Sequence, residues 1–404
     1  MKAGWQTKSL EEVCLFINGL WKGETPPFIN VGVIRNTNFT KDGLLDDSDI
    51  AYLDVEVKKF EKRSLQLGDV ILEKSGGGPK QPVGRVALFE KDEGNYSFSN
   101  FTSSIRIKNA DELDYRYLHK FLYWIYLSGL TEGMQSHSTG IRNLDANAYK
   151  AIKITFPSVS EQKRILLMLE EAFSEIDKAI SNTERNLKNA TELFERELYS
   201  IFSERGSAWD KCTLKNMSLE FGRGKSKHRP RNDPKLYGGE FPFIQTGDIR
   251  NANHIVTDYS QTYNEVGLAQ SKLWKKGTLC ITIAANIAET AILGFDSCFP
   301  DSVIGFVADP EKTDVHYVEY LLTSFKSRLK AKGKGSAQDN INLATFENEL
   351  FPFPSLPEQK EVVFRLNGLS TELRELKEIY EQKLIELHEL NKAILQKAFS
   401  GELK

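Results

Sequence analysis

The sequence predicts a mixed α/β (α+β) fold in which two globular domains alternate with two long helices as an internal repeat. An eight-residue motif occurs twice, as Phe-Pro-Ser-Val-Ser-Glu-Gln-Lys at 156–163 and as Phe-Pro-Ser-Leu-Pro-Glu-Gln-Lys at 353–360. Each copy opens a run of about 40 residues whose apolar side chains recur every three or four positions, as on a helix with one apolar face. The segments before the two copies are nearly equal in length, which indicates a repeat that fills the chain.

The two runs are predicted to be helices of matched length that pack on each other. They share their start and stop signals, which are Pro157 and Pro354, Glu161 and Glu358, and Gly206 and Gly401. The first apolar stripe is predicted at Leu169, Phe173, Ile176, Ile180, Thr183, Leu187, Ala190, Phe194 and Ile201. The second is predicted at Leu366, Leu369, Leu373, Leu376, Tyr380, Leu387, Leu390 and Ile394. At about 1.5 Å per residue, about 42 residues make a rod of roughly 63 Å.

These signals divide the chain into four segments. We expect a globular domain at 1–157, a long helix at 158–205, a second globular domain at 206–354 and a second long helix at 355–404. Trp5 and Trp209 begin the globules at corresponding places, and short apolar runs follow in the same order. Aligning these runs sets residues 30–35 opposite 245–250, where the first globule lacks a counterpart of Asp248.

Composition limits the kinds of partner. The chain has 404 residues and a formal net charge of −3, so a surface for nucleic acid has to be local. The four cysteines show neither a CxxC pair nor the spacing of a metal site, as expected of thiols in a reducing cytoplasm. The first residues do not resemble a signal peptide, and no apolar run is long enough for a membrane span. We therefore expect a cytoplasmic protein without membrane partners.

The repeated motif points to a family. The Pro-Ser-x-x-Glu-Gln-Lys entry to a long helix, the Phe-Ile pairs at 28–29 and 243–244, and the two dissimilar globules resemble the specificity subunit of type I restriction-modification systems. The resemblance covers essentially the whole chain. It implies that each globule is a target recognition domain that reads one half of a split DNA sequence. It also implies that the two helices form an antiparallel coiled coil, which spaces the readers and docks methyltransferase subunits.

The resemblance further implies a set of partners and cofactors. The chain would bind a bipartite duplex and two adenine-N6 methyltransferase (M) subunits, which carry S-adenosylmethionine. Separate restriction (R) subunits, which need ATP and Mg²⁺, would translocate and cut unmodified DNA. The chain itself would hold no cofactor and no metal.

Loops rich in basic and amide side chains are the candidates for DNA contact. The densest runs from Arg223 to Arg231, where five of nine residues are basic and glycine and proline favour a loop. A glycine-rich loop at 74–85 lets the backbone approach phosphate closely, and polar side chains around 135–143 and 332–342 suit base edges. Solvated surface loops are the competing interpretation of all these segments. The candidates are Lys22, Arg35, Lys74, Lys80, Gln81, Arg85, Arg142, Arg223, Lys225, Lys227, Arg229, Arg231, Arg250, Lys334 and Gln338.

Catalytic motifs are absent from the sequence in recognisable form. The run Phe221-Gly-Arg-Gly lacks the acidic strand and the Asp/Asn-Pro-Pro-Tyr/Phe motif of a methyl-transfer site. The Gly224-Lys225-Ser226 run lacks the upstream glycine of a P-loop. We therefore predict a non-catalytic DNA reader. Two alternatives stay open, a self-contained endonuclease or methyltransferase, and a coiled-coil scaffold without affinity for DNA.

Overall fold

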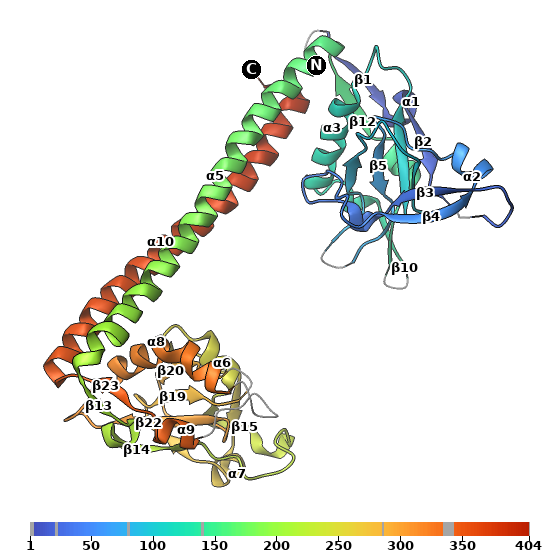
Figure 1. Cartoon of the computed structure of the whole chain (residues 1–404). Coiled ribbons are helices and arrows are strands. Elements are labelled where there is room, and N and C mark those ends of the chain that lie inside the picture. The colour runs from blue at the N-terminus through green and yellow to red at the C-terminus, as the bar shows by residue number, and fades with distance from the viewer. Residues whose placement is uncertain are drawn as a thin grey trace. The chain divides into compact units, whose positions relative to one another are not determined.

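The structure is a computed structural model that describes residues 4–20, 23–78, 81–138, 141–284, 287–333 and 343–403. The chain divides into two compact units (Figure 1). Unit 1 comprises Met1–Thr183 and Gln382–Lys404, and unit 2 comprises Glu184–Glu381. Each unit contains one globule together with one end of each long helix, α5 (Val159–Tyr199) and α10 (Leu356–Ser400). No helix in the described ranges combines the length and the apolarity that crossing a membrane requires.

Unit 1 is built on an antiparallel sheet with the order β2-β9-β5-β7. Its strands are Cys14–Asn18, Thr102–Ile107, Val70–Glu73 and Val86–Leu88. A second sheet, β4-β3-β8, consists of Ala51–Glu56, Phe28–Ile34 and Tyr96–Phe98. A third, β10-β11-β6, consists of Gln135–Ser138, Ile141–Leu144 and Ser75–Gly76. The pair β1-β12 joins Gln6–Ser9 to Lys153–Phe156 just before α5 begins.

Helix α3 (Tyr115–Leu127) supplies much of the unit 1 core. The shorter helices are α1 (Leu10–Val13), α2 (Val57–Glu61) and α4 (Ala146–Lys150). The core continues into the helix pair, because Leu169 of α5 and Phe399 of α10 belong to the same buried cluster. Phe399 packs edge-on against Tyr117 and Phe121, with ring centroids 5.3 and 5.4 Å away. The end of the helix pair is thus part of the globule's own core.

Unit 2 repeats this plan. Its main sheet, β14-β22-β19-β20-β16, consists of Ser218–Arg223, Val303–Ala308, Leu279–Thr282, Thr290–Leu293 and Ile255–Val256. The sheet β17-β15-β21-β18 consists of Gln261–Tyr263, Tyr237–Phe243, Ser297–Cys298 and Leu273–Trp274. The pair β13-β23 joins Asp210–Cys212 to Phe351–Phe353 just before α10 begins.

Helix α8 (Val315–Gly333) takes the place of α3 in unit 2. The shorter helices are α6 (Thr246–Asn251), α7 (Glu265–Ala269) and α9 (Leu343–Glu347). Phe202, from the π-helical turn Ser200–Glu204 after α5, packs edge-on against Tyr317 of α8 at 5.4 Å. This contact matches that of Phe399 with Tyr117, so the internal repeat predicted from the sequence extends to core packing.

Strand pairing corrects the predicted alignment of the two globules. Strand β3 runs parallel to β8 with Val33 opposite Ser97, and β15 runs parallel to β21 with Phe243 opposite Cys298. A phenylalanine directly follows both Ser97 in β8 and Cys298 in β21, so these two residues occupy matching places. Their partners Val33 and Phe243 therefore correspond to each other. The earlier alignment of residue 30 with 245 was therefore wrong by five positions.

The corrected alignment gives Asp248 the counterpart that it lacked. Arg35 now corresponds to Gln245, and Asn38 corresponds to Asp248. The backbone N–H of Arg35 donates to Asn38 Oδ1 at 2.9 Å, and that of Gln245 donates to Asp248 Oδ2 at 2.8 Å. Arg35 and Arg250 are consequently not equivalent residues. The Phe-Ile pairs misled the alignment because β3 continues to Ile34 whereas β15 ends at Phe243.

The predicted stripe of α10 needs a smaller correction. Leu376 and Leu390 are 40% and 45% exposed, so they lie outside the buried face. Positions 377 and 384 are half-buried instead, and a lysine such as that at 377 can take such a position because its alkyl stem is apolar. Gly401, with φ +78°, follows Ser400 and ends α10 as predicted, whereas α5 ends at Tyr199, before Gly206.

The repeated Glu-Gln-Lys motif has a structural explanation in its glutamine. Gln162 is fully buried, and its Nε2 donates to the carbonyls of Glu112 and Pro157 at 2.9 and 2.8 Å. Its Oε1 accepts from the backbone N–H of Asp114, the residue that caps α3. In unit 2, Gln359 makes the same three bonds to Lys312, Pro354 and Asp314. Each glutamine therefore fixes the start of a long helix to the start of the main globule helix.

Candidate nucleic-acid interface

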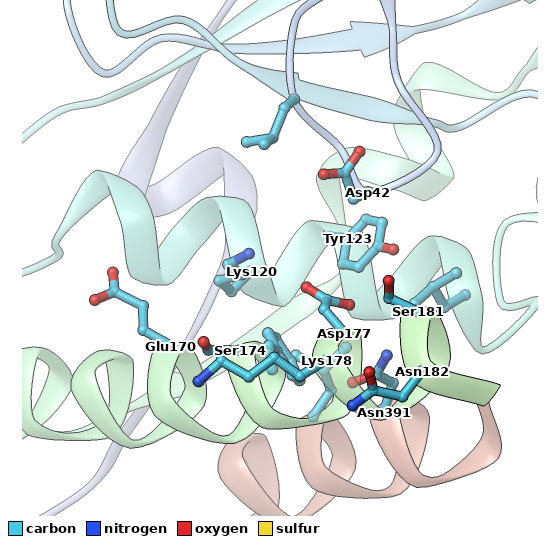
Figure 2. Close-up of a pocket in the computed structure, with 14 residues that line it drawn as sticks. Asp42, Lys120, Tyr123, Glu170, Ser174, Asp177, Lys178, Ser181, Asn182 and Asn391 are labelled. Carbon is cyan, nitrogen blue, oxygen red and sulfur yellow. The ribbon is translucent and has the colours of Figure 1, made fainter. Parts of the chain in front are cut away.

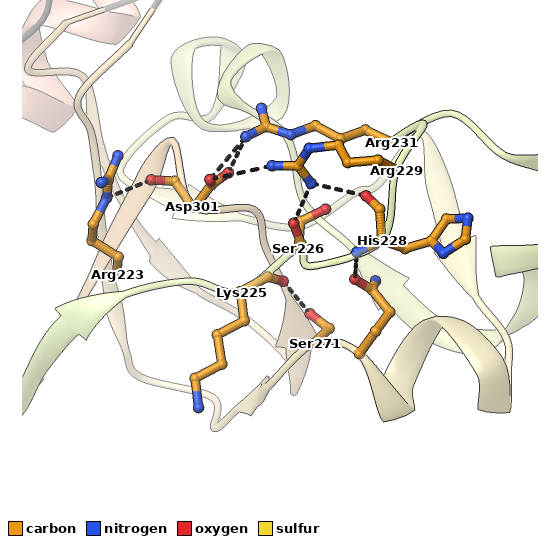
Figure 3. A network of polar contacts seen from close by, with 9 residues as sticks. Arg223, Lys225, Ser226, His228, Arg229, Arg231, Ser271 and Asp301 are labelled. Atoms are coloured by element: carbon orange, nitrogen blue, oxygen red, sulfur yellow. Dashed lines mark hydrogen bonds and ion pairs between the residues drawn. The ribbon is translucent and has the colours of Figure 1, made fainter.

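The basic loop of unit 2 lies between β14 and β15 and is organised around one carboxylate (Figure 3). Asp301 occupies the turn that leads from β21 into β22. Its carboxylate accepts two hydrogen bonds from Arg231 Nη2, at 2.6 and 2.8 Å, and lies 4.0 Å from Arg229 Nη2. Its carbonyl accepts from Arg223 Nε at 2.7 Å. Three of the five predicted basic residues thus converge on one turn, about 70 residues away in sequence.

The other two basic residues of this loop point into solvent. Lys225 and Lys227 are exposed, and within the described part of the chain neither ammonium group has an ion-pair partner. The backbone beneath them is held in place, because the Gly224 N–H donates to the Val303 carbonyl and Ser271 Oγ donates to the Lys225 carbonyl, both at 2.8 Å. The loop therefore presents exposed lysine side chains from a fixed backbone, which suits contact with phosphates.

Two candidate segments of unit 1 meet in one small sheet. Strand β11 pairs with β10 and with β6, so that Arg142 lies opposite Gly76 and Asn143 lies opposite Ser75. Ser75 Oγ lies 2.6 Å from Asn143 Oδ1, and the Leu144 N–H donates to the Lys74 carbonyl. The glycine-rich loop and the polar segment around 135–143, which the sequence offered as separate candidates, are thus neighbours.

Arg85 is held inside this end of unit 1. Its Nε and Nη2 donate to the two carboxylate oxygens of Glu73 at 2.7 and 3.1 Å, and Nη2 also donates to the Asn36 carbonyl. Glu73 is 1% exposed, so the pair neutralises a buried carboxylate. In the amide orientation that satisfies both groups, Gln81 Oε1 accepts from Arg85 Nη1 at 2.9 Å. The fold therefore already uses several donors of Arg85, and its contact with DNA stays a prediction.

The remaining described candidates of unit 1 are placed nearby. Arg35 Nη2 donates to the carboxylate of Asp49 at 2.9 Å and remains about one-third exposed. Lys74 Nζ donates to Asn18 Oδ1 at 3.1 Å, and partial burial lowers the pKa of the Lys74 ammonium. Arg142 Nη1 donates to Gln135 Oε1 at 3.3 Å. These side chains frame the same end of unit 1 as Arg85.

The remaining candidates for DNA contact lie outside the described residues or on another element. Lys22, Lys80, Lys334 and Gln338 lie outside the described residues. Arg250 is exposed on α6, two residues after Asp248.

Sequence reasoning missed two features of the unit 2 site. Asp301 has no local signal, since only the fold brings it to the arginines. Gln245 corresponds to Arg35, and its Nε2 donates to Gln261 Oε1 at 2.8 Å. A pair of partly exposed amides is suited to adenine edges. The segment 245–250 was already compared with 30–35 in the sequence analysis. The correct strand register would have set Gln245 opposite the candidate Arg35 and so identified it.

Unit 1 also contains a cavity of about 740 Å³ between α3, the loop around Asp42 and the helix pair (Figure 2). Lys120 of α3 faces Glu170 and Asp177 of α5 across it. Burial lowers the pKa of Lys120, whose ammonium lies 5.4 Å from the centre of the Phe173 ring. No group of three His, Cys, Asp or Glu side chains within the described ranges is arranged to hold a metal ion.

Comparison with known families identifies the chain. The family model described as type I restriction modification DNA specificity domain matches twice, at residues 2–187 and 207–387. The chain belongs to this family. It carries one DNA specificity domain in each half and is the specificity subunit of a type I restriction-modification system.

Individual relatives agree with this specificity-subunit assignment. The StySPI specificity subunit of a type I restriction enzyme from Salmonella potsdam is 21% identical over 431 residues, which cover 99% of this chain and 89% of that protein. A chain solved in work on complex assembly and conformational transition of the type I R-M system has a TM-score of 0.79 at 19% identity, covering 100% of this chain and 99% of that one. The HsdS subunit from Thermoanaerobacter tengcongensis has a TM-score of 0.65 at 19% identity, covering 100% and 98%. At this level of identity the two structures support the fold alone.

Proposed function

We propose that each globule reads one half of a bipartite duplex DNA target and that the chain performs no chemistry itself. The observation that carries this proposal is the repeat of one frame in which each unit presents basic and polar side chains of its own among the described residues. Unit 2 presents the loop from Arg223 to Arg231, and unit 1 presents the β10-β11-β6 sheet with Arg142 and Lys74. Two equivalent frames, each with its own basic and polar side chains, are suited to reading two half-sites.

The chemistry of these ends fits DNA recognition. Lysine and arginine bind phosphates, whereas arginine and amide side chains discriminate base edges in the major groove. Gln245 and Gln261 supply a pair of amides in unit 2, and Arg142 with Gln135 supplies an arginine and an amide in unit 1. The sequence-independent part of binding comes from the lysines, so affinity falls as salt concentration rises.

The helix pair offers a surface for two copies of one partner. Phe364 and Leu193 are 83% and 70% exposed and line one groove of about 860 Å³ in unit 2. The internal repeat places Leu167 and Leu390 at the corresponding positions of unit 1, and they are 66% and 45% exposed. A contiguous exposed apolar surface marks an interaction site. We assign each pair to the docking of one M subunit.

The remaining activities belong to the partners. The M subunits bind S-adenosylmethionine and methylate adenine at N6 after flipping the base out of the duplex. The R subunits use ATP and Mg²⁺ to translocate and cut DNA that lacks the methyl mark. The specificity subunit positions both on the target, and the complex works in the cytoplasm, where the DNA is.

A map of N6-methyladenine in a host genome tests the proposal. The host expresses the M subunit with the wild-type chain, without it, or with a chain whose residues 206–354 come from another family member. A split motif with a fixed gap should be methylated on both strands and should vanish without the chain. Exchange of 206–354 should change one half of the motif and leave the other half and the gap intact. Methylation that persists without this chain would overturn the proposal.

A further inference from the structure

The turn that carries Asp301 supports an inference that rests on the proposed function and concerns how unit 2 reads its half-site. Asp301 is on neither the basic loop nor its flanking strands, yet it binds Arg223 through its carbonyl and Arg231 through its carboxylate (Figure 3). Arg229 lies at the same carboxylate, while its Nη1 donates to the carbonyls of Ser226 and His228 at 2.6 and 2.8 Å. One side chain therefore holds the ends of two arginines together.

Charge explains why a carboxylate is needed there. The segment from Arg223 to Arg231 has five basic residues, and two guanidinium groups gathered at one point repel each other unless an anion lies between them. Asp301 supplies that anion. Only part of the loop's positive charge is cancelled, so the surface still attracts phosphate.

The backbone of the loop does not depend on Asp301. His228 Nε2 lies 2.8 Å from Asp233 Oδ2, and the His228 N–H donates to Gln270 Oε1 at 3.0 Å. The Tyr237 hydroxyl donates to the Arg231 carbonyl at 2.7 Å. These bonds, together with those of Gly224 and Lys225, hold the path of the chain. Replacing Asp301 should therefore release the guanidinium groups while the loop stays in place.

Orientation of arginine decides whether it reads bases or only phosphates. Recognition of a base by arginine requires guanidinium N–H groups aimed at acceptors such as O6 and N7 of guanine, and a freely rotating arginine loses this selectivity. Arg231 gives Nη2 to Asp301, and within the described residues its Nε and Nη1 have no acceptor. These two groups lie on different edges of the guanidinium, so the fixed side chain can donate a single directed hydrogen bond to a base from either one.

We propose that Asp301 is a specificity-determining positioning residue for the second half-site. It orients Arg231 and Arg229 for base contact, and its negative charge opposes phosphate binding at sequences where no base contact compensates. Asp301 therefore lowers affinity for non-specific DNA while it raises selectivity for the target.

Unit 1 provides a matched control position. Asp301 follows Phe299 by two residues, and Asn100 follows Phe98 by two residues in the corresponding turn from β8 into β9. Asn100 is uncharged. Its replacement tests whether any substitution in this turn impairs discrimination of a half-site or whether only a substitution of Asp301 does so.

The experiment uses the full chain in complex with its M subunits, and the target is the motif defined by the genome map. Variants Asp301→Asn, Asp301→Ala and Asn100→Ala are titrated with three duplexes: the target, the target with a scrambled second half-site and the target with a scrambled first half-site. Thermal unfolding of each variant is recorded alongside. Asp301→Asn keeps the shape of the side chain and removes its charge.

We expect both Asp301 variants to lose discrimination at the second half-site by roughly tenfold or more. Discrimination at the first half-site should not change, and affinity for the duplex with the scrambled second half-site should stay equal or rise. Asn100→Ala should leave discrimination at the first half-site, which unit 1 reads, as in the wild type. Unchanged discrimination in both Asp301 variants would overturn the assignment, and so would an equal loss of affinity for all three duplexes. A genome map without any split motif would instead refute the proposed function.

Discussion

The two units differ where the globule meets the helix pair. In unit 2, His254 Nδ1 lies 2.9 Å from Glu319 Oε2 on α8, and its Nε2 lies 3.2 Å from Ser370 Oγ on α10. The Tyr320 hydroxyl donates to Asn367 of α10 at 2.8 Å. In unit 1 the corresponding space is the cavity beside Lys120. One globule is bridged to α10 by hydrogen bonds, and the other leaves an opening lined with charges.

The backbone at this junction is the same in both units. Gly43 and His254 both have positive φ, +78° and +62°, and the carbonyl of each accepts from the strand beside it, at Leu88 and Ile292. Unit 1 places a glycine in this left-handed conformation, where glycine is unstrained. Unit 2 places a histidine there, whose side chain gains the contacts with Glu319 and Ser370.

The frame that holds both junctions is conserved between the units. Gln162 and Gln359 make matching bonds, and Phe399 and Phe202 make matching ring contacts. The comparison shows that the repeat constrains the contacts that attach each globule to the two long helices. It leaves the side chains around this attachment free to diverge, as it does for the segments that we propose to contact DNA.

The largest effect is expected at the exposed apolar pairs, which occur in both units with different side chains. The double variant Phe364→Glu with Leu193→Glu should weaken binding of one M subunit by about 4 kcal/mol, because two large apolar side chains lose their burial. Leu167→Glu with Leu390→Glu should remove the other copy with a smaller loss, since a leucine replaces the phenylalanine. Native mass spectrometry of the complex counts the copies.

Leu219→Glu serves as the control, since Leu219 is 68% exposed on β14 of the globule. It should retain two M subunits. If either double variant also binds two copies with wild-type affinity, these pairs are not the docking sites.

A middle-sized effect is expected at the buried glutamines. Gln359→Leu should lower the free energy of unfolding by about 3 kcal/mol, because the carbonyls and the N–H that it satisfies stay buried without partners. Gln162→Leu should cost less, because Gln359 Oε1 also accepts from Thr313 Oγ at 2.8 Å. Urea unfolding measures both values. Equal stability of both variants and the wild type would contradict the role of the motif, and the exposed Gln382→Leu is the neutral control.

The smallest effect is expected from pH, and its sign should differ between the units. The bond to Glu319 raises the pKa of His254, so protonated His254 stabilises the folded state. This contribution to the free energy of unfolding is present below about pH 6.5 and is lost as pH rises through the folded-state pKa. Burial lowers the pKa of His119 in unit 1 to about 3, so the folded state favours neutral His119. Its contribution to the free energy of unfolding is present above about pH 6.5 and is lost as pH falls toward 3.

Hydrogen exchange separates these two contributions, because peptides from β19 and β5 report on one unit each. His254→Gln should reduce protection of β19 at pH 5.5 by about 1 kcal/mol and should change it less at pH 8. In His119→Gln, the protection of β5 from hydrogen exchange should fall less on acidification than it does in the wild type. Identical pH profiles for the wild type and His254→Gln would show that the His254–Glu319 bond adds no stability.

Much of the frame could be predicted from the sequence alone. The repeated Glu-Gln-Lys motif and the heptad spacing predicted two equivalent helices, because helix signals are local and the period of 3.6 residues is written directly into the pattern. The order of strands and turns predicted the duplicated globule. The density of basic residues also identified the loop from Arg223 to Arg231.

The tertiary structure alone decided which side chains act together. Asp301 reaches Arg231 across about 70 residues, and Glu73 holds Arg85 inside the fold rather than on its surface. The equivalence of Arg35 with Gln245 followed from parallel strand pairing, in which a register error changes every assignment after it. Local sequence determines periodicity and turns, whereas pairing between distant segments depends on the packing of the whole unit, which no short stretch of sequence records.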